Sequence, residues 1–317
     1  MEILKVENLS RYFHIGHGLW GKKTTIKAVD GVNFSVQKNE VFALVGESGC
    51  GKSTVAKLIL RLLPATSGRI FFHSTDISGL KGKELMSFRR SVQVVFQDPF
   101  ASLNPRMKIY DILSEPLIVH KIGNRSRQRE IILDILGKVG LSEDILNRYP
   151  HEFSGGQRQR ICIARALVLY PQFIIADEPL SSLDVSIQAQ IINLFFQLKE
   201  EFHLSMLFIS HDLNVINYIS DRVAVMYMGK IVEIGSTEDV YNKPLHPYTR
   251  LLISSAPKIN KDTETIPTTS HDVTTVLSEP DGCAFEPRCK EAREICKRQK
   301  PEVITKNGRQ IACHLFT

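Results

Sequence analysis

The chain has 317 residues, of which 43% are hydrophobic, and it carries 40 lysine and arginine residues against 34 aspartate and glutamate residues. This composition predicts a folded globular protein with a substantial core. A net charge of +6 would suit a polyanionic partner, but the two signs are interleaved along the chain, which favours an ordinary solvated surface. The opening residues MEILKVENLSRYF lack the features of a signal peptide, and charged or turn residues interrupt every apolar run. We therefore expect a soluble, cytoplasmic protein without a membrane span.

The first strong pattern is a short apolar run at 41–45 that leads directly into the segment GESGCGKST at 46–54. Such a run is typical of a buried parallel strand, and residues 55–63 can continue as a helix until Pro64 stops it. The segment matches the phosphate-binding loop pattern at every defined position and lies in the strand-to-helix context that this loop needs. A fortuitous glycine turn is the alternative, which the context disfavours.

The residue types of this loop suit a nucleotide phosphate. Glycines let the backbone curl so that successive N–H groups face the phosphates, and the following helix adds the positive end of its dipole. We expect Lys52 to contact the β- and γ-phosphates and the Ser53 hydroxyl to bind Mg²⁺. Cys50 is interpreted as a small tolerated side chain, with a redox-sensitive thiol as the alternative. The expected binding residues are Gly46, Glu47, Ser48, Gly49, Cys50, Gly51, Lys52, Ser53 and Thr54.

The middle of the chain alternates between apolar runs and helical stretches, which favours an α/β sheet. The runs lie at 92–96, 173–176, 206–210 and 223–226. Residues 99–160 contain amphipathic helical stretches and no convincing strand, so we predict a helical insertion there. Residues 185–202 predict a helix with one apolar face, because apolar residues recur every three or four positions. This face consists of Ile187, Ile191, Leu194, Leu198 and Phe202.

Two acids follow the apolar run at 173–176. A phosphate-binding loop needs a carboxylate at a strand end to hold Mg²⁺, and Asp177 stands in that position. Glu178 comes next, and we expect it to orient or deprotonate the attacking water, because one carboxylate cannot easily reach both positions. An ordinary strand end with two solvated acids is the alternative.

A polar segment at 258–279, rich in Thr, Ser and Asp, predicts a linker before a cysteine-rich end. Cys283, Cys289, Cys296 and Cys313 are separated by five, six and sixteen residues. Disulfides are rare in a reducing cytoplasm, so these cysteines indicate metal or redox chemistry. Four thiolates suffice for one [4Fe-4S] cluster or one structural Zn²⁺, and the spacing lacks the paired two-residue gaps of zinc ribbons.

The segment FSGGQRQR at 153–160 resembles the signature motif of ABC-transporter ATPases, and it lies between the two nucleotide motifs as in that family. The resemblance implies an ATPase that sandwiches two ATP molecules between two chains. Ser154, Gly155, Gly156 and Gln157 are then expected to face the γ-phosphate held by the partner chain, since a glycine turn at a helix N-terminus binds anions. One chain therefore holds halves of two sites.

Further positions match the same family. The resemblance implies that Gln97 contacts Mg²⁺ and the attacking water and that His211 contacts the γ-phosphate. It also implies that Asp184 is the key acid of a loop that crosses the dimer interface. Phe13 aligns best with the aromatic side chain that stacks on adenine, and Tyr12 is the competing choice; either residue is otherwise a core aromatic. Since no catalytic position is degenerate, we expect active ATP hydrolysis.

The implied fold is α/β: an ABC-type P-loop ATPase core with an antiparallel β subdomain, a helical subdomain insertion and a small C-terminal Cys-rich extension. The core is expected at 1–98 and 161–240, and the helical subdomain with the signature motif at 99–160. The extension with its four cysteines is expected at 241–317.

The segment LHPYTRLLISSAP at 245–257, followed by GCAFEPRC, is similar to the C-terminal extension of ATPase subunits from bacterial oligopeptide, dipeptide and nickel importers. The match then covers essentially the whole chain, and it favours [4Fe-4S] over the alternatives of Zn²⁺ and of no metal, with His314 as a less favoured substitute ligand. It implies a heterodimer with a second homologous ATPase, docked beneath two membrane-spanning permease subunits that receive cargo from an extracytoplasmic substrate-binding protein. The location is then peripheral, at the cytoplasmic face of the cell membrane.

The expected function is ATP hydrolysis that powers peptide import, and the cargo stays open between oligopeptides, dipeptides and nickel or a metal chelate. A soluble ABC-type ATPase that acts on nucleic acid is disfavoured, because such proteins typically carry two ATPase halves or a long coiled coil. We therefore expect no nucleic-acid partner. A noncatalytic regulatory subunit is disfavoured by the presence of Asp177, Glu178 and His211.

Overall fold

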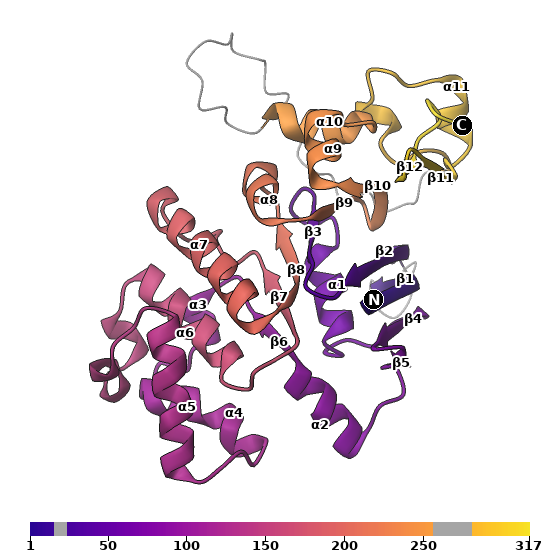
Figure 1. The fold of residues 1–317 in the computed structure, drawn as a ribbon. Coiled ribbons are helices and arrows are strands. Elements are labelled where there is room, and N and C mark those ends of the chain that lie inside the picture. The colour runs from indigo at the N-terminus through magenta and orange to yellow at the C-terminus, as the bar shows by residue number, and fades with distance from the viewer. Residues whose placement is uncertain (16–23, 256–280) are drawn as a thin grey trace.

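The computed structural model describes residues 1–15, 24–255 and 281–317 (Figure 1). The linker predicted at 258–279 lies outside the described residues. The described residues form two sheets and a set of helices, and a strand is present at each apolar run where one was predicted.

An eight-stranded sheet forms the centre of the molecule, with the strand order β11-β12-β10-β9-β3-β8-β7-β6. Five neighbouring strands pair in parallel: β6 (Val92–Val95), β7 (Phe173–Asp177), β8 (Ser205–Ser210), β3 (Val41–Val45) and β9 (Arg222–Tyr227). Every residue of β3, β7 and β8 is buried, because helices cover both faces of a parallel sheet. Figure 1 shows α7 (Val185–Phe202) on one side of these strands and α1 (Lys52–Ile59) on the other.

Alternate residues of β3 belong to the two halves of the core. Ala43 packs on the side of α7, in one cluster with Phe195 and Phe208, whereas Leu44 packs on the side of α1 with Ile59. The predicted apolar face of α7 is buried at Ile191, Leu194 and Leu198, and Phe195 is a further buried member that the three-or-four spacing did not include. Ile187 and Phe202 are only partly buried.

A smaller antiparallel sheet has the order β2-β1-β4-β5. Its strands are β1 (Glu2–Ile15), β2 (Thr24–Gln37), β4 (Ser67–Phe72) and β5 (Thr75–Asp76). One face of β2 is buried against the core and the other is partly exposed, the pattern expected of an antiparallel sheet with one solvated side. Phe34 of β2 stacks on Phe42 of β3 with ring centroids 5.1 Å apart, which joins this sheet to the central one. The predicted α/β fold with an antiparallel β subdomain is therefore confirmed.

Residues 99–160 form helices, as predicted, and they lie together at one side of the molecule (Figure 1, magenta). The helices of this region and those that connect it to the sheet are α2 (Gly82–Ser91), α3 (Pro99–Ser102), α4 (Ile109–Val119), α5 (Arg125–Lys138), η1 (Glu143–Asn147), η2 (Pro150–Glu152) and α6 (Gly155–Leu167). The expected domain boundary between residues 160 and 161 falls inside α6. The side chains of Ile132, Ile135 and Ile161 are fully buried, so α5 and α6 share one core.

The C-terminal segment, residues 281–317, joins the central sheet. Its elements are η3 (Glu286–Arg288), α11 (Glu294–Arg298), β11 (Val303–Lys306) and β12 (Arg309–Ala312). β12 pairs antiparallel with β10 (Lys230–Ser236), and β11 pairs with β12. Phe285 and Tyr248 are buried in the same core cluster as the parallel strands. Few apolar residues of the C-terminal segment are buried, so the segment packs against the core domain and does not form a separate core of its own.

One buried carboxylate on β10 connects this strand to the start of α10 (Pro247–Ser255) and to β12. The remaining helices are α8 (Leu213–Ile219), which precedes β9, and α9 (Thr237–Asn242), which follows β10. Glu233 is fully buried and accepts hydrogen bonds from the His246 N–H at 3.0 Å and the Thr249 hydroxyl at 2.7 Å. Arg309 of β12 forms an ion pair with the same carboxylate. A buried carboxylate is tolerated only when it is paired and hydrogen-bonded in this way.

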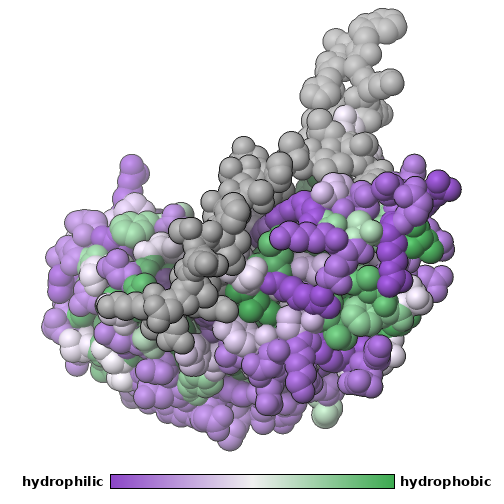
Figure 2. Space-filling view, turned by 90° about the horizontal axis from the view of Figure 1, so that it is seen from above, coloured by the Kyte–Doolittle hydropathy of each residue, from purple (hydrophilic) through white to green (hydrophobic). Residues whose placement is uncertain are grey.

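The surface seen from above is mainly hydrophilic on the side of the C-terminal segment, with scattered hydrophobic areas (Figure 2). Exposed ion pairs such as Lys297–Glu294 belong to this side. None of the helices in residues 1–15, 24–255 and 281–317 combines the length and the hydrophobicity that crossing a bilayer requires.

We expect the protein to lose stability as the pH falls from about 6.5 to about 4, because of His246. The side chain is 1% exposed, and burial, followed by the charge of Arg250, lowers its pKa from 6.5 to about 4. In this window the unfolded chain binds a proton that the folded chain excludes, so the free energy of unfolding decreases with falling pH. The stability that the neutral His246 contributes is fully present above the pKa that this residue has in the unfolded chain. About 2 kcal/mol of it is lost between pH 7 and pH 5.

Urea unfolding at pH 7 and pH 5 measures this effect. The variant His246→Asn keeps an acceptor near the Tyr248 N–H, which lies 3.0 Å from His246 Nδ1, and should lose most of the pH dependence. His203→Asn is the matched control at the exposed end of α7, where the left-handed backbone (φ 52°) suits asparagine. An equal pH dependence in the His246→Asn variant and the unmodified chain would contradict the assignment.

Candidate nucleotide-binding site

The predicted phosphate-binding loop connects β3 to α1 and is exposed at Ser48 and Gly49. Two of its glycines are required by close contacts. A Cβ at Gly46 would lie 2.2 Å from the carbonyl oxygen of Met226, and one at Gly51 would lie 2.1 Å from that of Ala28. Gly51 also has φ 112°, a conformation that only glycine adopts easily. The loop thus presents backbone N–H groups at the start of α1, where Thr54 continues the helix.

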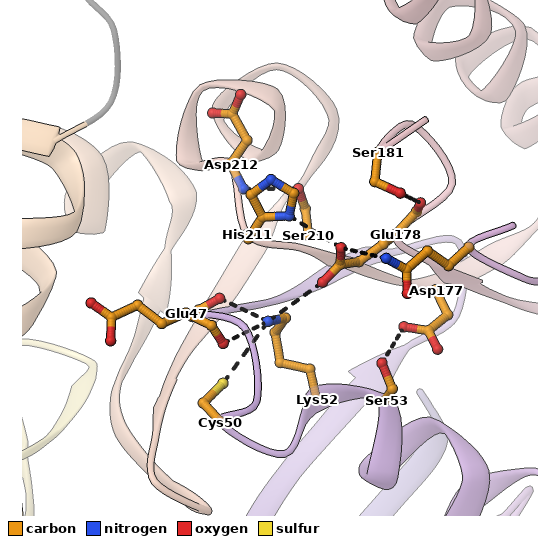
Figure 3. Close-up of polar contacts among 12 residues, drawn as sticks. Glu47, Cys50, Lys52, Ser53, Asp177, Glu178, Ser181, Ser210, His211 and Asp212 are labelled. Carbon is orange, nitrogen blue, oxygen red and sulfur yellow. Dashed lines mark hydrogen bonds and ion pairs between the residues drawn. The ribbon is translucent and has the colours of Figure 1, made fainter. Parts of the chain in front are cut away.

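Lys52 is 3% exposed and lies at the centre of the site (Figure 3). Its amine donates to the carbonyl oxygens of Gly46 at 2.7 Å and Glu47 at 3.0 Å, and it lies 3.6 Å from Glu178 Oε1. The amine is therefore folded back on its own loop and beside an acid. Burial raises the pKa of the neighbouring Cys50 thiol, which keeps this thiol protonated, as expected of a small tolerated side chain that is not a nucleophile.

Ser53 and Asp177 form the next pair. The Ser53 hydroxyl donates to Asp177 Oδ1 at 3.0 Å, and Asp177 ends β7 at 6% exposure (Figure 3). Burial raises the pKa of Asp177, and the hydrogen bond from Ser53 opposes this shift. Two oxygen donors that meet at a strand end are the ligand chemistry that Mg²⁺ prefers, so these residues fit the predicted metal.

Glu178 brings together the three residues predicted to be catalytic. Its Oε2 accepts from Gln97 Nε2 at 3.3 Å and lies 3.1 Å from His211 Nδ1, while its Oε1 faces Lys52. The Glu178 side chain is 12% exposed and that of His211 is 55% exposed. Glu178 also has φ 46°, a left-handed backbone that costs about 1–3 kcal/mol in a residue with a side chain. Side chains from the segments that follow β3, β6 and β8 therefore converge on the carboxylate that follows β7.

The signature residues lie in the helical region. Ser154 is the N-cap of α6, and a capping box joins it to Gln157, whose backbone N–H lies 3.4 Å from the serine Oγ. A Cβ at Gly156 would lie 2.7 Å from Ile187, so the turn is packed on the beginning of α7. Asp184 is the N-cap of α7 and is exposed. Among the described residues, no hydrogen bond or ion pair links Ser154, Gly155, Gly156 or Gln157 to the phosphate-binding loop.

The two candidate aromatic residues on β1 differ in their contacts. The Tyr12 hydroxyl donates to Asp30 at 2.6 Å, and the Lys27 amine lies 5.2 Å from its ring centre. The Phe13 ring has no polar group to satisfy and lies 4.6 Å below the Arg11 guanidinium. Tyr12 is thus already engaged by charged neighbours. Both rings have a cationic side chain over one face, and they differ in that the Tyr12 hydroxyl is already bonded to Asp30.

Glu47 makes contacts that the phosphate-loop pattern does not predict. Its carboxylate forms two hydrogen bonds with Arg288 of the C-terminal segment, at 2.8 and 2.7 Å, and its backbone N–H donates to the Tyr248 hydroxyl at 2.9 Å. Arg288 and Tyr248 lie 241 and 201 positions after Glu47 in the sequence, and no local pattern predicts these contacts.

The four cysteines of the C-terminal segment are free thiols that interact with one another. Burial raises the pKa of Cys313 to about 11, and the charges of the other three cysteines, Cys283, Cys289 and Cys296, add to this shift. However, within the described part of the chain no group of three or more His, Cys, Asp or Glu side chains is arranged to hold a metal ion. The expected four-thiolate ligand set is therefore not formed in the structure.

Comparison with known proteins identifies two family models along the chain. Residues 29–181 match the ABC transporter family, and residues 232–296 match the family described as oligopeptide/dipeptide transporter, C-terminal region. The chain is 49% identical to the oligopeptide transport ATP-binding protein AppF of Bacillus subtilis, over 99% of this chain and 98% of the relative. It is 46% identical to the oligopeptide transport ATP-binding protein OppF of Escherichia coli, over 98% of this chain and 95% of the relative.

Solved structures agree with these matches. The dimeric ATP-binding cassette MJ0796 in a post-hydrolysis state with ADP and Pi has a TM-score of 0.65 at 29% identity, over 74% of this chain and 98% of that one. The ADP conformation of the cassette MJ1267 has a TM-score of 0.66 at 30% identity, over 80% of this chain and 99% of that one. With a phosphate loop, paired acids and a signature turn in one fold, the chain belongs to the family of ATP-binding subunits of oligopeptide and dipeptide ABC transporters.

Proposed function

We propose that this chain hydrolyses ATP to power the import of peptides through an ABC transporter in a bacterial cytoplasmic membrane. The observation that carries the proposal is the convergence of Lys52, Gln97 and His211 on Glu178 beside an intact phosphate-binding loop. Similarity to named peptide-transport subunits along nearly the full length supports the cargo class.

The residue roles follow from the chemistry of the site. Lys52 leaves the loop carbonyls and binds the β- and γ-phosphates, while Ser53 and Asp177 hold Mg²⁺, which neutralises phosphate charge when bound. Glu178 accepts a proton from the attacking water. Gln97 and His211, both hydrogen-bonded to Glu178, orient that water and the γ-phosphate. Phe13 stacks on the adenine ring, with Tyr12 as the competing residue.

The signature residues act on the ATP of a second chain. Ser154 and the N–H groups of Gly155 and Gly156 lie at the N-terminus of α6, where an anion is favoured. Within the described residues they form no hydrogen bond or ion pair with their own phosphate-binding loop, which supports a role in a partner's site, with Gln157 holding the turn by its capping box. Asp184, exposed at the start of α7, then lies at the interface.

The partners are a second, homologous ATPase, two membrane-spanning permease subunits and an extracytoplasmic substrate-binding protein. The chain then works at the cytoplasmic face of the membrane. We assign the ATPase core to 1–98 and 161–240, the helical subdomain to 99–160 and the peptide-transporter extension to 241–317, with α6 crossing from one part to the next.

The four cysteines are proposed to hold a [4Fe-4S] cluster, with Zn²⁺ as the alternative. The Cys283 N–H donates to the carbonyl oxygen of Cys296 at 2.7 Å, which brings two of the four residues together, and thiolates are the ligands that both groups use. Iron and acid-labile sulfide analysis of anaerobically purified protein tests the cluster, and zinc analysis tests the alternative. Absence of both metals from the purified chain would remove the proposal.

Reconstitution of the complete transporter in vesicles tests the function. We expect phosphate release that requires Mg²⁺ and that rises when the binding protein carries an oligopeptide or a dipeptide, together with uptake of labelled peptide. Uptake of nickel or a nickel chelate without peptide uptake would instead establish the alternative cargo. A complex that binds and hydrolyses no ATP would refute the proposed function altogether.

A further inference from the structure

The C-terminal segment touches the phosphate-binding loop at one residue. Arg288 places its two terminal nitrogens on the two carboxylate oxygens of Glu47, at 2.8 and 2.7 Å. The two side chains are 27% and 25% exposed, so the contact is partly shielded from water. A bidentate arginine–carboxylate pair of this kind fixes orientation as well as charge.

Arg288 is itself held in place by aromatic rings. Its guanidinium lies 5.9 Å from the ring centre of Tyr227 and 5.8 Å from that of Phe285. These two rings meet edge to face with centroids 5.3 Å apart, and both are buried. Cation–π contacts to a packed pair of rings restrict the rotamers of the arginine, so that little conformational entropy is lost when it binds Glu47.

Tyr248 supplies a second anchor on the same loop residue. Its side chain is fully buried, packs on Tyr227 and Phe285, and accepts the Glu47 N–H at 2.9 Å. Both the backbone and the carboxylate of Glu47 are therefore held by one aromatic cluster, formed by Tyr227, Tyr248 and Phe285.

The charge of Glu47 matters because one acid, Glu178, already lies beside Lys52. The Lys52 amine lies 3.6 Å from Glu178 and 3.0 Å from the Glu47 carbonyl oxygen, so a released Glu47 carboxylate is within reach of the same amine. In Figure 3 the Glu47 carboxylate points away from Lys52. A free carboxylate in this loop would compete with the phosphates for Lys52 and would repel them.

We propose that Arg288 is a positioning residue of the nucleotide site, which holds the Glu47 carboxylate away from Lys52 and the phosphates, so that docking of the C-terminal segment sets the affinity for ATP. This inference rests on the proposed function for the identity of the ligand. It assigns to the C-terminal segment a direct effect on nucleotide binding.

Equilibrium titration of the purified full chain with a fluorescent ATP analogue tests the proposal, together with KM and kcat for ATP in the assembled transporter. For Arg288→Gln we expect the dissociation constant and KM to rise about five- to tenfold, as a partly screened carboxylate near the phosphates would cause. We expect kcat to change less than about twofold, since no group that touches the attacking water is altered. Arg288→Lys, which keeps the charge, should recover part of the affinity.

The double variant Glu47→Gln/Arg288→Gln separates charge control from mere packing. If Arg288 acts through the Glu47 carboxylate, removing that carboxylate restores the affinity to within about twofold of the unmodified chain. Glu291→Gln is the matched control, because it breaks another arginine–glutamate pair between α10 and the C-terminal segment, Arg250–Glu291 at 2.7 Å. We expect that control to bind ATP normally.

Two results would overturn the inference: unchanged affinity in Arg288→Gln, or a double variant that binds as weakly as the single one. Either would leave the proposed function intact, because the unmodified chain would still bind and hydrolyse ATP. Thermal unfolding of each variant identifies any that fails to fold. If Arg288→Gln does not fold, Arg288→Lys decides instead, since a loss of affinity of about fivefold or more in this variant would show that the retained charge does not control Glu47.

Discussion

Replacing Glu178 by glutamine is expected to lower phosphate release by the assembled transporter by about 10²- to 10⁴-fold while ATP binding is kept. The carboxylate is the acceptor on which Gln97, His211 and Lys52 converge, and an amide cannot take a proton from water at neutral pH. The substitution also removes the negative charge 3.6 Å from Lys52, so this amine becomes more available to the phosphates. Binding should therefore be equal or tighter, and the two chains should stay closed around ATP.

The measurement pairs steady-state phosphate release with an ATP-binding titration and with size-exclusion analysis of the ATP-loaded chains. Glu201→Gln is the matched control, since Glu201 is an exposed acid on α7 that pairs with Lys138 at 2.7 Å, away from the site. We expect that control to hydrolyse ATP normally. Turnover at the parent rate by Glu178→Gln would show that another group accepts the proton.

Replacing Lys52 by methionine is expected to weaken ATP binding by about 100-fold or more, and hydrolysis falls with it. The amine is buried at 3% exposure beside the loop, and on ATP binding it exchanges its hydrogen bonds to two loop carbonyls for charge-assisted bonds to the phosphates. Each charge-assisted hydrogen bond contributes about 1.5–3 kcal/mol, and two of them account for a loss of this size. Methionine keeps the length of the stem and the packing of its methylene groups.

Titration with ATP in the presence of Mg²⁺ measures the loss, and thermal unfolding verifies that the variant is folded. Lys83→Met makes the same chemical change at an exposed position of α2 and should leave the affinity unchanged. If Lys52→Met binds ATP within about threefold of the unmodified chain, the loop's backbone N–H groups supply the affinity and the lysine assignment is wrong.

The parallel strands could be predicted from the sequence because burial on both faces leaves an uninterrupted apolar run, as in Val41–Val45 and Phe173–Asp177. The site residues at the ends of these strands followed from motif spacing, and the structure brings Lys52, Asp177, Glu178 and His211 together. In such a sheet the site residues follow the ends of strands that are neighbours in space. A polar residue directly after a predicted strand is therefore a candidate for the site.

Other contacts were not predictable, because they join residues that only the whole fold brings together. The Glu47–Arg288 pair spans 241 positions, and neither the loop pattern around Glu47 nor the sequence around Arg288 indicates the other residue. The left-handed backbone of Glu178 has no local signature, since glutamate is not a residue that favours it. The cysteine spacing suggested a ligand set, but loop conformation decides whether sulfurs meet, and spacing does not determine it.

The β11–β12 hairpin has a consequence for solubility. Without it, β10 would be the outermost strand of the central sheet, and the backbone groups that now pair at Glu233–Ile311 and Ile234–Gln310 would be unpaired. Such a strand recruits strands from other molecules and seeds aggregation. The hairpin covers β10 and ends the sheet at β11, a short strand with the partly exposed sequence Val303-Ile304-Thr305-Lys306, whose lysine opposes further pairing. A chain cut before this hairpin is therefore expected to precipitate during synthesis even though every ATP-binding motif is still present.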